Sequence, residues 1–248
     1  MDILRNPRNR TIMLIVISVL VLLTLVLALW WRTQSATPRN AAPPTGTPAT
    51  IILIPGYGGG TDGFQTITSQ LRGSGAKVLI LNIGNGEGDI NDYAASLQQV
   101  TRESAAPVAW IGYSMGGLIA RSAYTADLVP LVSSITSWGS PLHGTKSAAL
   151  ANFANACPTA CQQMDPGSEF LDTLPRWPNP PTRWVSIFSP NDEVIRPYDS
   201  SELDESGVVN IDLGTCSPAA TPTHSELPAN PVVLSLTKAN LADQPVAC

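Results

Sequence analysis

The sequence predicts an α/β domain with a mostly parallel central sheet and helices on both faces. From Thr50 to Leu241, apolar segments of strand type alternate with segments of helix type, which is the pattern of a parallel sheet. An apolar segment (residues 12–31) and a proline-rich segment (33–49) precede this region. We therefore expect three parts, over residues 1–32, 33–49 and 50–248.

The apolar segment comes first. Residues 12–31 are long enough to cross a bilayer core of about 30 Å at about 1.5 Å per residue. Arg5, Arg8 and Arg10 precede them, which favours a cytoplasmic N-terminus. The apolar core exceeds that of most cleaved signals, so we expect an uncleaved signal anchor, one transmembrane helix, with the domain outside the cell membrane. A signal cleaved near 35–36 or 41–42, giving a secreted domain, is the alternative.

The segment after the apolar one has the composition of a linker, and the region beyond it is acidic. Residues 33–49 are rich in Pro, Thr, Ala and Ser, a composition typical of a partly extended spacer. Four of the 14 basic residues but only one of the 19 acidic residues lie within 1–32. The remainder is acidic and has no basic stripe, which argues against nucleic acid as a partner.

The elements of the domain follow from its apolar runs and its Gly, Pro and Asp breaks. Strands are expected over 50–54, 77–81, 107–111, 134–139, 182–188 and 208–213. Helices are expected from about 62 to 71, 90 to 103, 118 to 124 and 231 to 241. The stretch between the fourth and fifth strands is long for a plain crossover, so we expect it to line the rim of a site.

Four cysteines fit a compartment outside the cytoplasm, where disulfides are permitted. Four cysteines allow three connectivities, and the sequence does not choose between them. We favour the local pairs Cys157–Cys161 and Cys216–Cys248. A metal site is the rival interpretation, but no histidine or second close pair accompanies these cysteines.

The segment Gly112-Tyr113-Ser114-Met115-Gly116-Gly117 connects the third strand to a helix. A serine between two glycines at such a turn is the nucleophile-elbow pattern, in which a tight turn lifts the hydroxyl above the sheet edge. Ser114 is therefore the candidate nucleophile. The alternative is an ordinary turn of small residues.

A serine nucleophile needs a base, oriented by an acid. The chain has two histidines, and His224 follows the last strand, where the chain order Ser, Asp, His places the base. His143 is expected to have a structural role, bonding a nearby loop backbone. Asp192 follows the strand 182–188 and is the candidate acid, with Glu193 as its competitor.

Further acidic residues are expected to cap helices or face solvent: Asp165, Asp172 and Asp199.

The oxyanion of the intermediate needs two N–H donors, each typically worth about 10²- to 10³-fold in rate. The backbone N–H of Met115, directly after the nucleophile, and that of Tyr57, in the glycine loop after the first strand, are the candidates. That loop lacks the ending of a phosphate-binding loop, and its plainer interpretation is a tight turn.

These motifs resemble those of the small, secreted bacterial lipases of the α/β-hydrolase superfamily. The resemblance covers Thr50 to about Leu241 and is carried by the runs 54–59, 112–117 and 189–194 and by Thr223-His224. It implies a minimal α/β-hydrolase fold without a large cap, with Ser114, Asp192 and His224 as the triad and Tyr57 and Met115 as oxyanion donors. Two departures are Pro55 and Tyr113, which stand where many relatives have histidine.

The expected chemistry is acyl transfer to water through an acyl-enzyme, with no metal or organic cofactor. The expected substrates are lipid or small esters with short to medium acyl chains, because the domain has no room for a large cap. We expect a membrane contact only through the N-terminal segment and no obligate protein partner. The alternatives are an acyltransferase or thioesterase on the same triad, or a non-catalytic, membrane-tethered binding module.

Overall fold

A computed structural model describes residues 18–24, 26, 46–73, 75–147, 157–176, 182–216 and 221–248. These residues fall in two units, divided after residue 40. In the first unit, residues 18–24 are helical and exposed. None of the helices in the described ranges is long and apolar enough to span a membrane. The expected anchor and spacer fall mostly outside these ranges, and so remain predictions.

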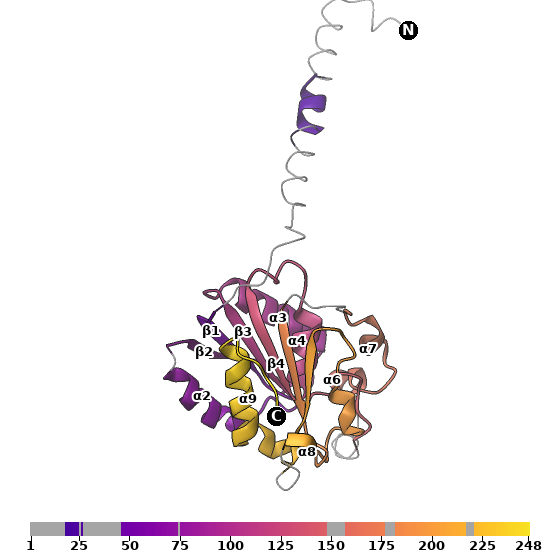
Figure 1. Cartoon of the computed structure of the whole chain (residues 1–248). Coiled ribbons are helices and arrows are strands. Elements are labelled where there is room, and N and C mark those ends of the chain that lie inside the picture. Colours follow the sequence, from indigo (N-terminus) through magenta and orange to yellow (C-terminus); the bar gives the residue numbers. More distant parts are fainter. Residues whose placement is uncertain are drawn as a thin grey trace, which may run out of the picture. The chain divides into compact units, whose positions relative to one another are not determined.

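The second unit is built on a parallel sheet (Figure 1). Its strand order is β2-β1-β3-β4-β5-β6, and every neighbouring pair is parallel. The strands are β1 (Thr50–Ile54), β2 (Lys77–Ile80), β3 (Val108–Tyr113), β4 (Val132–Trp138), β5 (Arg183–Phe188) and β6 (Val208–Asp212). The expectation of a mostly parallel sheet is confirmed.

Helices cover both faces of this sheet. The helices α2 (Gln65–Arg72) and α9 (Pro231–Leu241) pack on one face, and α3 (Ile90–Arg102) and α4 (Met115–Ala123) pack on the other (Figure 1). The short helices α6 (Thr159–Gln163) and α7 (Glu169–Thr173) contribute to the second face. The remaining elements are η1 (Asp62–Phe64), η2 (Tyr198–Ser201), α8 (Leu213–Cys216) and η3 (His224–Ala229).

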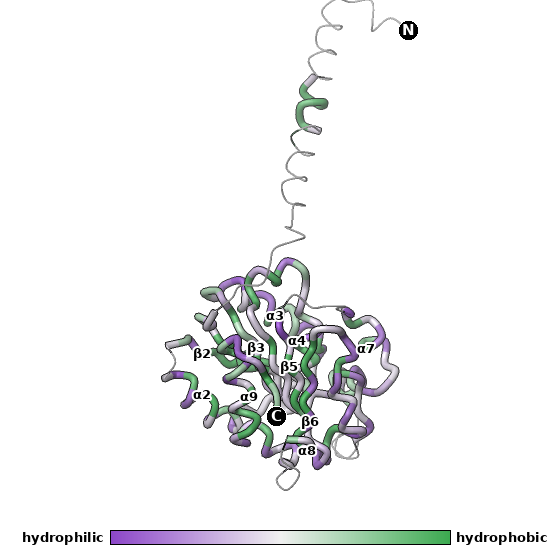
Figure 2. The backbone as a smooth tube through the Cα atoms, viewed as in Figure 1, coloured by the Kyte–Doolittle hydropathy of each residue, from purple (hydrophilic) through white to green (hydrophobic). Residues whose placement is uncertain are grey.

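The alternation of side chains along the buried strands explains the two layers. Ile51 and Leu53 of β1 lie in the core beneath α2 and α9, whereas Ile52 and Ile54 lie in the core beneath α3 and α4. Successive residues of a strand point to opposite faces, so β1, which is covered on both faces, is apolar along most of its length. Figure 2 shows hydrophobic stretches within the sheet, interrupted by paler segments.

Two element boundaries near Ser114 differ from the expectation. β3 continues through Gly112 and Tyr113, because both residues pair with β4. The helix begins at Met115, directly after Ser114, rather than at Leu118. One residue therefore separates strand from helix.

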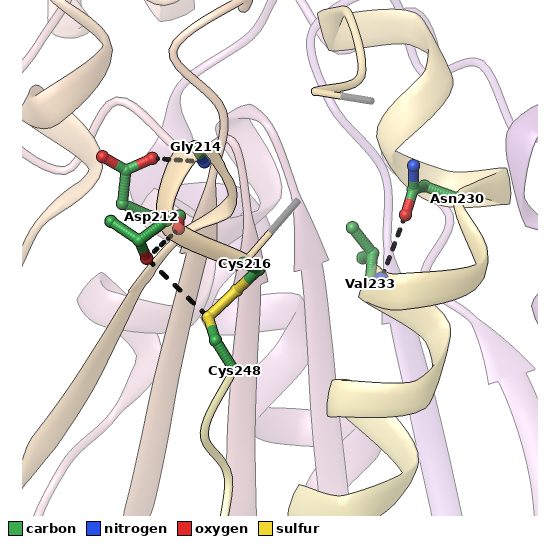
Figure 3. The surroundings of a disulfide bond; sticks show 7 residues. Asp212, Gly214, Cys216, Asn230, Val233 and Cys248 are labelled. Carbon is green, nitrogen blue, oxygen red and sulfur yellow. Dashed lines mark hydrogen bonds between the residues drawn. A yellow bond between two sulfur atoms is a disulfide. The ribbon is translucent and has the colours of Figure 1, made fainter. Parts of the chain in front are cut away.

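Both expected disulfides, Cys157–Cys161 and Cys216–Cys248, are formed, with Cα–Cα distances of 5.5 and 4.7 Å. Figure 3 shows the second bond, which joins the last residue of α8 to the C-terminal residue. At the start of α8, the Asp212 carboxylate accepts the Gly214 N–H at 2.7 Å. The C-terminal tail is thus tied to the segment that leads from β6 toward His224.

The Cys216–Cys248 bond spans 32 residues, so its removal releases a long loop in the unfolded chain. We expect the pair Cys216→Ser and Cys248→Ser to lower the free energy of unfolding by about 3 to 4 kcal/mol, measured by urea unfolding. The matched pair Cys157→Ser and Cys161→Ser, with a separation of 4, should cost about 2 kcal/mol. A larger loss from the short loop would contradict this account.

Candidate active site

The candidate residues lie on loops at the carboxyl ends of parallel strands. Tyr57 follows β1, Ser114 follows β3, Asp192 follows β5 and His224 follows β6. After β1 the chain moves to β2 on one side of the sheet, and after β3 it moves to β4 on the other side. Ligands of open α/β sheets bind at such a switch point, outside the carboxyl ends of the strands. Ser114 and Tyr57 flank this point.

The backbone of Ser114 is held in a strained conformation, with φ 54° and ψ −124°. Its N–H donates to the Trp138 carbonyl at 2.9 Å, which ties the turn to β4. A Cβ added at Gly112 would lie 2.6 Å from the backbone of Gly116, and one added at Gly116 would overlap the Ile54 carbonyl. The glycines are therefore required by close backbone contacts, and the turn has the geometry expected of a nucleophile elbow.

The candidate base and acid are paired behind this turn. The His224 ring nitrogen Nδ1 lies 2.7 Å from Asp192 Oδ2, and the two residues are 6% and 1% exposed. The other carboxylate oxygen of Asp192 accepts the N–H groups of Val194 and Ile195 at 2.9 and 2.7 Å. A carboxylate oxygen accepts hydrogen bonds, so the His224 tautomer with the proton on Nδ1 fits this contact. In this tautomer, Nε2 is the ring nitrogen that can accept a proton.

Tyr113, the residue directly before Ser114, contacts His224. The rings of Tyr113 and His224 are 5.0 Å apart at 31°, and the Tyr113 hydroxyl donates to the His224 carbonyl at 3.2 Å. Within the described residues, the Ser114 hydroxyl makes no hydrogen bond to His224. Such bonds are often long without substrate and tighten in the reacting complex. Ser114 is 8% exposed.

The candidate oxyanion donors flank Ser114. Met115 is the first residue of α4, so its N–H has no acceptor within the helix. A Cβ added at Gly56 would lie 2.9 Å from the Cβ of Ser114, which places the peptide before Tyr57 directly against Ser114. Burial and the charge of Glu87 raise the pKa of the Tyr57 phenol, so its side chain is neutral. The backbone N–H groups of Tyr57 and Met115 are thus near the serine.

A second glycine loop supports the Tyr57 loop. A Cβ added at Gly86 would lie 2.9 Å from the nitrogens of Gly58 and Gly59. A Cβ added at Gly59 would in turn overlap the Gly84 carbonyl. The loops after β1 and β2 therefore meet backbone to backbone.

Several residues around His224 make contacts that the sequence does not predict. A Cβ added at Gly139, where φ is 49°, would lie 2.9 Å from Asp192 Oδ2 and 3.2 Å from His224 Nδ1. Glu193, considered as a competing acid, instead accepts the His224 N–H at 3.0 Å. Tyr113 was noted only as a departure from relatives. The one sequence signal for Gly139 was its position at the end of an expected strand.

The other histidine has the expected structural role. The backbone N–H of His143 donates to the Ser200 carbonyl at 3.0 Å, and its Nδ1 lies 3.3 Å from the same oxygen. Asp172 and Asp199 lie in the first turns of α7 and η2. Among the described residues, no group of three or more His, Cys, Asp or Glu side chains could hold a metal ion.

Two loops hold the base and acid together. Ser189 donates to the Pro222 carbonyl at 2.6 Å, and Asn191 donates to the Thr221 carbonyl at 3.3 Å. A capping box at the start of η3 adds two bonds from Thr223 to Glu226, which lower the pKa of Glu226. His224 is therefore fixed by its own helix start and by the loop that carries Asp192.

Comparison with known proteins supports the fold. No family model and no curated protein matches the sequence. The structure is similar to a Bacillus licheniformis lipase in mature form (16% identity, TM-score 0.62, 81% of this chain and 94% of that one). It is also similar to the type II thioesterase of the borrelidin biosynthetic cluster (15%, 0.53, 84% and 96%) and to an Exiguobacterium antarcticum esterase (11%, 0.52, 79% and 93%). The chain has the α/β-hydrolase fold.

The backbone contact between the loops after β1 and β2 predicts that a methyl group added at Gly86 displaces the Tyr57 loop. We expect Gly86→Ala to displace the Gly58 and Gly59 nitrogens and to lower the kcat of a reaction that uses the Tyr57 N–H by about 10²-fold, because this candidate donor is then misplaced. Gly84→Ala is the matched control, since Gly84 also has a positive φ but open space around its Cβ. It should cost about 1 kcal/mol of stability and leave kcat nearly unchanged. Equal losses of kcat would contradict the contact model.

Proposed function

We propose that this chain, an α/β-hydrolase by fold, is a carboxylic ester hydrolase of the lipase or esterase type. The observation that carries the proposal is the strained Ser114 turn next to the buried Asp192–His224 pair. Backbone strain of this kind costs on the order of 1 to 3 kcal/mol and clusters at active sites. The similarity to a lipase and an esterase supports the same reaction class.

The reaction divides into two acyl transfers. The Ser114 hydroxyl attacks the ester carbonyl carbon as its proton moves to His224 Nε2, and the carbonyl oxygen takes the negative charge. The N–H groups of Tyr57 and Met115 stabilise that oxyanion. Collapse expels the alcohol, which takes the proton from Nε2. Water then attacks the acyl-enzyme by the same route and releases the acid and free Ser114.

The substrate class in this proposal is esters of short to medium acyl chains, including lipid esters. The domain from residue 50 to 248 has a minimal size, and its longest crossover, between β4 and β5, carries only the short helices α6 and α7 in its described part. A site without a large helical cap would be open, so we expect weak activation by a lipid–water interface.

The proposed location is the outer side of the cell membrane. Residues 12–31 would act as the signal anchor, and Arg5, Arg8 and Arg10 would remain in the cytoplasm. The two disulfides support an oxidising compartment for the domain. The membrane would then be a partner only through the N-terminal segment.

Two alternative functions remain: another acyl-transfer enzyme with the same triad, and a binding module in which the triad is not catalytic. An acyltransferase or a thioesterase would share the triad, and the similarity to a type II thioesterase keeps this candidate open. A non-catalytic, membrane-tethered module would have no need of a strained Ser114. Retention of the strain and of a fully hydrogen-bonded Asp192 therefore favours an enzyme.

The first test is hydrolysis of p-nitrophenyl esters, from acetate to palmitate, by the full chain and its Ser114→Ala variant. We expect an optimum at short to medium chains and a loss of about 10⁶-fold in kcat without the serine hydroxyl. Negligible rates in both proteins would favour the binding module, or an acyltransferase that needs its own acceptor.

The two histidines provide an internal control for that test. His224→Ala should cost about as much as Ser114→Ala, because the two residues act as a unit. His143→Ala should keep most of the activity, since His143 bonds a loop backbone. Loss of hydrolysis in the His143 variant alone would contradict the assignment of the base.

The proposed signal anchor is tested by measuring whether the full chain stays in the membrane fraction, not by enzyme activity. In a bacterial host, we expect the full chain to remain with membranes after alkaline extraction and to have an intact N-terminus by mass spectrometry. Replacing Arg5, Arg8 and Arg10 by Glu should disturb its orientation. A released protein that begins near residue 36 or 42 would show a cleaved signal instead.

A further inference from the structure

The main chain of His224 is bound at both ends by the neighbours of the other two triad members. Tyr113 directly precedes Ser114, and its hydroxyl donates to the His224 carbonyl at 3.2 Å. Glu193 directly follows Asp192, and its carboxylate accepts the His224 N–H at 3.0 Å. Tyr113 therefore links the His224 backbone to Ser114, and Glu193 links it to Asp192, without a hydrogen bond to the imidazole.

Both main-chain groups of His224 require such partners. His224 is the first residue of η3, so its N–H has no acceptor within that helix. The residue is buried, and a buried peptide group left without a partner costs on the order of 1 to 3 kcal/mol. Glu193 is itself exposed, so it reaches the N–H from the solvent side.

Tyr113 acts on the ring of His224 as well as on its backbone. The two rings lie 5.0 Å apart at 31°, and Phe64 meets Tyr113 edge-on at 6.4 Å. Burial, together with the charges of Asp192 and Glu193, raises the pKa of Tyr113. The hydroxyl therefore stays protonated and able to donate across the working range of a hydrolase.

We propose that Tyr113 and Glu193 are positioning residues that hold His224 between Ser114 and Asp192. This inference rests on the proposed ester hydrolysis for its kinetic consequence. The Asp192–His224 bond sets the rotation of the ring, but it leaves the position of the Cα to the backbone contacts. Because a displacement of about 1 Å can cost about 10²-fold in rate, the two contacts govern proton transfer without touching the substrate.

The test uses the full chain with separable substitutions. Tyr113→Phe keeps the ring contact and removes the hydroxyl. Glu193→Ala removes the acceptor, whereas Glu193→Gln keeps an oxygen that can accept the same N–H. Tyr198→Phe and Glu169→Ala are matched controls, because Tyr198 packs on Phe188 and Glu169 is an exposed residue of α7.

We expect Tyr113→Phe and Glu193→Ala each to lower kcat about 3- to 10-fold with KM nearly unchanged, and to lower the melting temperature by about 2 to 10 °C because a buried peptide group loses its partner. The double variant should lose more than the product of the two single losses, because either contact alone still holds the peptide. Glu193→Gln and both controls should stay within about twofold of the parent. A double loss equal to the product, or a Gln variant as impaired as the Ala variant, would overturn the proposal.

A second readout does not depend on activity. The proton shared by His224 Nδ1 and Asp192 should give a downfield proton resonance, which we expect to weaken or shift in the double variant and to persist in the controls. An inactive parent that shows this response would refute ester hydrolysis while supporting the positioning role. A resonance unchanged in the double variant would refute the positioning role whatever the activity.

Discussion

Ser114 occupies a backbone conformation that non-glycine residues rarely adopt, with φ 54° and ψ −124°. Such a conformation persists only where the surroundings hold it, and here the bond from Ser114 to the Trp138 carbonyl and the contacts of Gly112 and Gly116 do so. The turn ends β3 and begins α4 within one residue. The hydroxyl and the Met115 N–H consequently lie together at the carboxyl edge of the sheet.

The parallel sheet brings the other groups to the same edge. The loops after β1, β5 and β6 supply Tyr57, Asp192 and His224, and the buried carboxylate of Asp192 is stabilised by three accepted hydrogen bonds. Burying an ionised group is tolerated only with such compensation. The backbone of His224 is hydrogen-bonded in the same way, since its carbonyl accepts from Tyr113 and its N–H donates to Glu193.

Much of the geometry of the candidate site could be predicted because its signals are local. The glycine spacing around Ser114 identified the elbow, and a choice between two histidines identified the candidate base. The helix α9 begins and ends where the sequence predicts, since Asn230 caps it and Pro231 occupies its first turn. The short helices α6, α7 and α8 were not predicted, because four or five residues carry too little periodicity to be recognised.

By itself, the sequence determined the alternation of strands and helices and the tight glycine-flanked turn at Ser114, because each depends on residues close together in the chain. Only the tertiary structure decided that Gly139 leaves room for the Asp192–His224 pair and that Tyr113 and Glu193 bind the His224 backbone. These contacts join residues 31 and 111 positions apart. Local spacing carries no information about them, since they arise only when the sheet aligns the ends of its strands.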